Sequence, residues 1–171
     1  MIVTCLENTY LGKNDFAGSH TASGLWEVEQ LHIYIERDQS IESKANYRRP
    51  LTVEAEIKSS SDRCSISMTL FAEDSGKNKE ISLAIGGTPV SWIFYPGNVR
   101  GALGDDGKQG VEYWRKVKLE LDDSEKVDFY IDNEHKYSDT SSQKEGKLRF
   151  VAGCKSMMIK NINIGKYSES I

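Results

Sequence analysis

Residues 51–58 read Leu-Thr-Val-Glu-Ala-Glu-Ile-Lys. The apolar residues Leu51, Val53, Ala55 and Ile57 alternate with polar ones, so all four side chains would point to the same side of an extended chain. This period of two is typical of a β-strand that has one buried and one solvated face. The stretch therefore predicts a strand whose apolar side faces a core.

The same alternation recurs along most of the chain. It is present at 64–72, 81–85, 90–94, 127–132 and 148–152, and further strands are expected at about 25–36, 113–121 and 157–165. Serine-, aspartate- and glycine-containing turns separate these runs, and no stretch shows a sustained helical stripe with caps. About ten short strands without helices predict an antiparallel sandwich or barrel.

Two local irregularities are predicted within these strands. The run Asp132-Asn133-Glu134 supplies turn-forming residues directly after the strand at 127–132. In the last strand Ile162 and Ile164 share a face, whereas Ile159 is out of phase with them. A bulge near Asn161 would bring all three isoleucines to the same face.

Length and charge limit the classes of function. The chain has 171 residues, which fits a single domain over 1–171, and its net charge is −4 with a pI of about 5.5. An acidic chain is a poor partner for phosphate backbones, so we expect no nucleic-acid binding. No apolar run reaches the ~20 residues of a membrane span. The start lacks a signal peptide, so the chain as given is expected to be cytoplasmic, or secreted if a leader has been removed.

Motifs for metal and nucleophilic chemistry are missing from the sequence. Cys5, Cys64 and Cys154 form no C-x-x-C pair, and the three histidines are isolated along the chain. Two stretches are expected to be irregular: the polar segment 37–49 and the glycine-rich loop 96–112. Within that loop Asp105-Asp106 could hold calcium together with nearby carbonyls, although no EF-hand motif is present. We therefore expect no cofactor, with calcium as the alternative.

The order of several motifs resembles a known superfamily. The motifs are Asp15-Phe16, Trp26-Glu27-Val28-Glu29, the run 47–58, Tyr113-Trp114, the strand 127–132, the run 146–150 and the closing run 158–164. The series resembles the concanavalin A-like lectin/glucanase superfamily, with laminin G-like modules and the 3-keto-disaccharide hydrolase domain as the nearest likenesses. This resemblance implies an all-β jelly-roll sandwich of two antiparallel sheets. It also implies ligands on the concave sheet or on the loops at one rim.

A carboxylate pair is the first candidate site. Glu54 and Glu56 project from one side of a strand, with Cα atoms roughly 6–7 Å apart. Such a pair could serve glycoside hydrolysis as acid and as base or nucleophile, or it could belong to a solvated strand face. The glucanases of the resembled superfamily carry a glutamate-x-aspartate-x-x-glutamate strand, which this chain lacks. That difference argues against catalysis.

Aromatic side chains are the second candidate, because sugars stack their C–H faces on aromatic rings. Tyr130 lies on the strand face that also carries Asp128, opposite the apolar residues of the same strand. Tyr95 and Trp92 are further candidates, although Trp92 alternates with Phe94 and is also consistent with the core. Trp26 and Trp114 are expected in the core. The predicted ligand-binding residues are Tyr130, Trp92, Tyr95, Glu54, Glu56 and Asp128.

These observations favour a non-catalytic, lectin-like carbohydrate-binding module whose partner is a carbohydrate or a protein surface. Two alternatives remain at this point. One is an enzyme related to glycoside hydrolases, which would use Glu54 and Glu56. The other is a protein-interaction module of laminin G type. One sandwich fold supports many functions, so the fold alone does not rank the three.

Overall fold

A computed structural model describes residues 2–3, 9–18, 33–59, 65–72, 81–86, 91–95, 97–102, 113–153 and 155–165. Apart from the 3₁₀ turn η1 (Lys13–Asp15), its regular elements are strands. The strands are β1 (Ile2–Val3), β2 (Thr9–Leu11), β3 (Phe16–Gly18), β4 (Ile33–Ile35), β5 (Ser40–Ser43), β6 (Asn46–Arg48), β7 (Leu51–Ser59), β8 (Ile66–Ala72), β9 (Ile81–Gly86), β10 (Ser91–Tyr95), β11 (Val99–Ala102), β12 (Arg115–Leu121), β13 (Lys126–Ile131), β14 (Glu134–Thr140), β15 (Glu145–Ala152) and β16 (Met157–Gly165).

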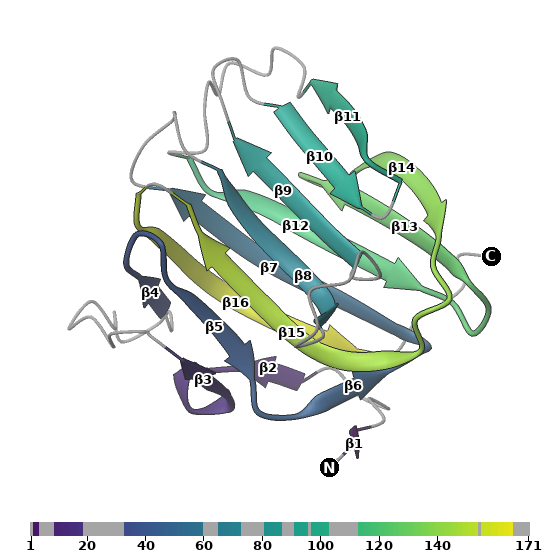
Figure 1. The fold of residues 1–171 in the computed structure, drawn as a ribbon, viewed down its shortest axis with the longest axis horizontal. Helices are drawn as coiled ribbons and strands as arrows, with labels where there is room; N and C mark the ends of the chain where they lie inside the picture. Colours follow the sequence, from purple (N-terminus) through teal and green to yellow (C-terminus); the bar gives the residue numbers. More distant parts are fainter. Residues whose placement is uncertain are drawn as a thin grey trace.

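The strands form two sheets that face each other (Figure 1). A nine-stranded sheet runs β1-β6-β15-β8-β9-β10-β11, with β5 beside β15 and β3 beside β5. A seven-stranded sheet runs β14-β13-β12-β7-β16-β2, with β4 also paired to β16. All the described pairings are antiparallel except that of β1 with β6. The predicted two-sheet antiparallel sandwich is confirmed.

The core lies between the inner faces of the two sheets. The four apolar residues of the run at 51–58 are all fully buried on β7, as their period of two predicts. Aromatic rings join the sheets at one end: Phe94 of β10 stacks on Phe129 of β13 with ring centroids 4.6 Å apart. Trp92 meets the same Phe129 ring edge-on at 4.8 Å. Burial on both inner faces fixes the strand registers, because a one-residue slip would turn each apolar set outward.

The two predicted irregularities are confirmed. Asp132 and Asn133 both have positive φ angles, 53° and 67°, and form the two-residue turn between β13 and β14. Aspartate and asparagine tolerate this left-handed conformation better than most residues, and such turns match the twist of a hairpin. In β16 the pairing with β7 shifts between Lys160 and Asn163, and Asn161 has a φ of 51°. This bulge leaves Ile159, Ile162 and Ile164 all buried.

Other expectations require correction. The polar segment 37–49 is not irregular throughout, because it contains β5 and β6, whose Ile41 and Tyr47 reach the core. The loop 96–112 includes strand β11, and its residues 103–112, with Asp105 and Asp106, lie outside the described part of the chain. The three cysteines and Trp26, which we expect in the core, also lie outside it. The described residues contain no helix long and apolar enough to cross a membrane.

Candidate functional site

Four of the six predicted ligand-binding residues lie on the outer face of the seven-stranded sheet. Glu54 and Glu56 belong to β7, and Asp128 and Tyr130 belong to β13. Lys118 of β12 lies between the two strands, directly opposite both Glu54 and Tyr130. The structure therefore brings these four residues to one face, where their role in binding remains a prediction.

Neighbouring side chains already contact the candidate residues on this face. The carboxylate of Glu54 is 3.4 Å from the ammonium of Lys116, and Glu56 accepts a hydrogen bond from the side-chain amide of Asn161. The ammonium of Lys118 lies 4.4 Å from the centre of the Tyr130 ring. A sugar that stacked on this side of Tyr130 would have to displace that cation. The arrangement is typical of a solvated, charge-paired sheet face.

Trp114 lies on the same face and not in the core, where we had expected it. Its side chain is half-buried, and the ammonium of Lys160 lies 4.2 Å from the centre of its ring. Trp114 comes directly before Arg115, the buried first residue of β12. Because successive side chains of an extended chain alternate, the indole lies over the outer side of the sheet beside Lys58. The Trp114 ring is thus covered by a lysine side chain and not by core residues.

Asp128 is nearly buried although it lies on an outer face, with 7% of its surface exposed. The hydroxyl of Ser138 donates to its Oδ1, and His135 Nε2 lies 3.1 Å from the same oxygen. Burial raises the pKa of Asp128, but the contacts with Ser138, His135 and Lys126 outweigh it, so the pKa lies below its ordinary value. Asp128 is therefore a well-held carboxylate, and His135 is not isolated as the sequence suggested.

This serine, histidine and aspartate do not form a nucleophilic relay. One histidine nitrogen, Nε2, faces both Asp128 Oδ1 and, at 3.0 Å, the hydroxyl of Ser138. A relay requires the two ring nitrogens to contact the acid and the nucleophile separately. The short contact of Ser138 with Asp128 instead bonds β14 to β13.

The remaining two predicted residues lie elsewhere. Trp92 is only 6% exposed and packs against Phe129 and Tyr137, so it belongs to the core and is not on a binding face. Its alternation with Phe94 had already allowed that interpretation. Tyr95 follows on β10, points to the outer face of the nine-stranded sheet and is 40% exposed.

Tyr95 ends a row of side chains that crosses five strands of the nine-stranded sheet. Strand registers place each member directly opposite the next, and the strands lie side by side in one layer (Figure 1). The row, called here the Tyr95 row, consists of Glu42 on β5, Arg149 on β15, Thr69 on β8, Ser82 on β9 and Tyr95 on β10. Four inter-strand spacings give it a length of about 19 Å.

Side-chain contacts hold the polar members of the row in place. Arg149 donates from Nη2 and Nε to one oxygen of Glu42, at 2.8 and 3.0 Å, while Lys147 lies 3.5 Å from the other. The hydroxyls of Thr69 and Ser82 are 3.0 Å apart. Thr69 is 4% exposed, whereas Ser82 is more accessible. The hydrogen bond to the buried threonine therefore holds the serine hydroxyl in place. The row thus offers a fixed carboxylate, a guanidinium, a hydroxyl and an exposed ring.

Small side chains occupy the middle of this face. On β8 and β9 the outward positions beside the row are Ser67 and Ala84, which are opposite each other. They are flanked by Val151 on β15 and by Ile93 on β10. The hydroxyl-rich alternation within 64–72 was visible in the sequence, but which strands lie next to β8 was not.

Metal ligation has no support in the described part of the chain. No three His, Cys, Asp or Glu side chains there are grouped so that they could hold an ion. The calcium alternative rested on Asp105 and Asp106, which the structure does not describe. It therefore remains a prediction.

Comparison with known proteins gives structural relatives but no sequence relatives. No family model and no curated protein matches the sequence. A putative glycosyl hydrolase from Parabacteroides distasonis superposes with a TM-score of 0.65 at 14% identity, over 94% of this chain and 99% of that one. The fold is that of the concanavalin A-like lectins and glucanases.

Other relatives of this sandwich include enzymes and binding modules. A carbohydrate-binding module from Bacillus subtilis gives a TM-score of 0.60 at 14% identity, over 97% of this chain and all of that one. A β-glucanase from Bacillus licheniformis gives 0.59 at 11% identity, over 95% and 99%. At such identities the likeness establishes the concanavalin A-like sandwich alone, because this fold carries both activities.

Proposed function

We propose that this chain is a non-catalytic carbohydrate-binding module that binds an oligosaccharide on the outer face of the nine-stranded sheet. The observation that supports this most strongly is the Tyr95 row. It combines an exposed aromatic ring with fixed polar groups on a rigid sheet. Structural likeness to a carbohydrate-binding module and to glycosyl hydrolases is in keeping with the proposal.

The chemistry of the row suits a sugar. The C–H face of a pyranose ring would stack on Tyr95, and its hydroxyls would exchange hydrogen bonds with Ser82, Arg149 and Glu42. Contacts within the row already hold Arg149, Glu42 and Ser82 in place, so binding would cost little side-chain entropy. The length of about 19 Å favours several sugar units in a chain over a single one.

The same face argues against hydrolysis. A glycosidase needs two carboxyl groups on either side of the scissile bond, one of which donates a proton. Glu42 is the single carboxylate of the Tyr95 row, and the cations Arg149 and Lys147 both contact it. One carboxylate engaged by two cations does not supply the pair of carboxyl groups that the reaction needs.

A thermal-shift screen against mono- and oligosaccharides tests the proposal, because a ligand that binds only the folded state raises the melting temperature. The double variant Thr69→Val/Ser82→Ala should weaken binding of any hit by roughly tenfold, the loss of one or two hydrogen bonds. Thr52→Val, on the outer face of β7, is the matched control and should bind normally. A flat screen, or equal binding by all three proteins, would reject the proposal and favour a protein partner.

A further inference from the structure

Arg49 is a buried arginine far from the Tyr95 row. It follows β6 in the corner before β7. Its side chain is 2% exposed. Charged side chains are rarely buried so fully unless polar partners surround them. Burial lowers the pKa of Arg49, and the nearby charges of Asp122 and Glu125 partly offset this effect. The partners of this cation therefore need an explanation.

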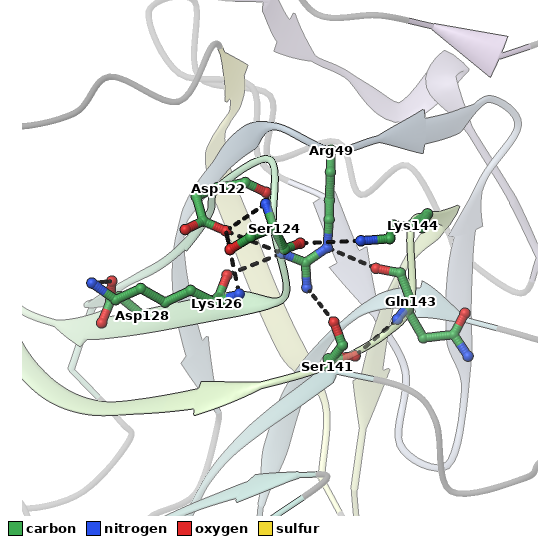
Figure 2. Close-up of polar contacts among 8 residues, drawn as sticks. All are labelled: Arg49, Asp122, Ser124, Lys126, Asp128, Ser141, Gln143 and Lys144. Carbon is green, nitrogen blue, oxygen red and sulfur yellow. Dashed lines mark hydrogen bonds and ion pairs between the residues drawn. The ribbon is translucent and has the colours of Figure 1, made fainter.

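Backbone carbonyls from two other segments surround the guanidinium (Figure 2). Nη1 donates to the carbonyls of Lys126, the first residue of β13, and of Asp122, which follows β12, at 3.0 and 3.3 Å. Nη2 donates to the carbonyl of Ser141 at 2.9 Å, and Nε donates to that of Gln143 at 2.7 Å. Asp122 adds a carboxylate oxygen 3.9 Å from Nη1. All three nitrogens of the guanidinium therefore donate, and together they contact four carbonyls.

The two segments that carry these four carbonyls also have hydrogen bonds of their own, which do not involve Arg49. Oδ1 of Asp122 accepts from the amide and the hydroxyl of Ser124, at 2.9 and 2.7 Å, and from the amide of Lys126 at 3.2 Å. The Ser141 amide donates to the Glu125 carbonyl at 2.8 Å, which joins the two segments. The carbonyls are therefore held in position partly without the guanidinium.

We infer that these two segments form a guanidinium-binding site, which the chain fills with its own Arg49. The site would bind a free guanidinium cation once the side chain is removed. Four carbonyls that accept from Nε, Nη1 and Nη2 match the spread-out donors of a guanidinium and not a compact ammonium ion. Without Arg49, the four carbonyls would lose the donors that the guanidinium supplies, which is unfavourable for folding.

Removing the side chain tests the inference. In the 171-residue chain, Arg49→Ala should lower the melting temperature by on the order of 10 °C, as expected when one partner of a buried polar network is removed. Methylguanidinium at non-denaturing concentration should restore much of this loss in a saturable way, and methylammonium at equal ionic strength should not. Arg37→Ala is the control, because Arg37 is exposed and its guanidinium lies 3.9 Å from the equally exposed Asp38. It should neither lose stability nor gain from methylguanidinium.

Three outcomes would overturn the inference. They are an unchanged melting temperature of Arg49→Ala, no restoration by methylguanidinium, and equal restoration by methylammonium. Should Arg49→Ala be unfolded at every temperature, its refolded fraction after dilution from urea provides the second readout. That fraction should rise with methylguanidinium and not with methylammonium, and equal yields with the two cations would contradict a guanidinium site.

Discussion

Nη1 of Arg115 lies 2.8 Å from Oδ2 of Asp132, so the first residue of β12 is bonded to the turn that follows β13. The Arg115 side chain is 1% exposed, and Oδ1 of Asp132 accepts the amide of Lys116 at 3.0 Å. The Asp132 carboxylate thus accepts hydrogen bonds both from a buried guanidinium and from a backbone amide of the neighbouring strand. The contact fixes the end of the β12–β13 ladder.

Replacing this carboxylate by an amide should destabilise the fold. Asparagine tolerates the positive φ of position 132, so Asp132→Asn keeps the turn and removes the charge. Because Asp132 is about one-third exposed, solvent screens part of the loss. We expect the free energy of unfolding in urea to fall by roughly 1–3 kcal/mol. Asp123→Asn, in an exposed turn, should change it by less than about 0.5 kcal/mol. Equal stability of the two variants would contradict the role of this ion pair.

Gly101 should not tolerate even a methyl group. A Cβ at this position would overlap the indole ring of Trp92, which lies in the core and cannot move aside easily. Gly101→Ala should therefore lower the free energy of unfolding by roughly 1–3 kcal/mol, the usual cost of overpacking. Chemical denaturation measures the change, with Arg100→Ala on the same exposed strand as the control. A neutral Gly101→Ala would show that β11 does not pack tightly against the Trp92 indole.

The stability contributed by Asp128 should depend on pH. Its pKa is lowered in the folded state, so its contribution is fully present above the unfolded pKa of about 3.9. The contribution is lost as the pH falls through the folded pKa. Asp128→Asn should therefore be less stable than the unaltered chain at pH 7, by roughly 1.5–3 kcal/mol. The difference should shrink at pH 3. Urea unfolding at both values measures it, and a difference that does not change with pH would contradict the assignment.

The glutamates predicted from sequence should be dispensable for glycan binding. Glu54 and Glu56 contact Lys116 and Asn161 on the face opposite to the Tyr95 row. The double variant Glu54→Gln/Glu56→Gln should therefore bind any glycan with an affinity within about twofold of the unaltered chain, because no contact of the row is touched. Calorimetric titration measures this. A large loss of affinity would move the site to the seven-stranded sheet and revive the carboxylate-pair hypothesis.

Most of the fold was predictable because its signals are local. The alternation of Val53, Ala55 and Ile57 indicated a half-buried strand, and the phase break between Ile159 and Ile162 indicated the bulge at Asn161. Short strands such as β5 and β6 were missed because their polar residues carry little alternation. The pairing of β5 with β15 holds them in place, and that contact depends on residues more than 100 positions apart.

The candidate site was less predictable, because it depends on which strands are neighbours. Tyr95 was a candidate from its residue type alone, and the row that makes it interesting comes from five strands in the order β5-β15-β8-β9-β10. Tyr130 looked equally suitable in the sequence, where the ammonium of Lys118 near its ring could not be foreseen. Period-two patterns assign a face within a strand, but they do not assign its partners.

The affinities of two tyrosine variants for one glycan show which outer face of the sandwich binds it. Tyr95→Ala and Tyr130→Ala should be titrated calorimetrically with the oligosaccharide that gives the largest thermal shift. We expect Tyr95→Ala to lose at least about tenfold in affinity, because a stacking platform is removed, and Tyr130→Ala to stay within about twofold. Loss of binding in Tyr130→Ala with normal binding in Tyr95→Ala would contradict the account and place the ligand on the seven-stranded sheet.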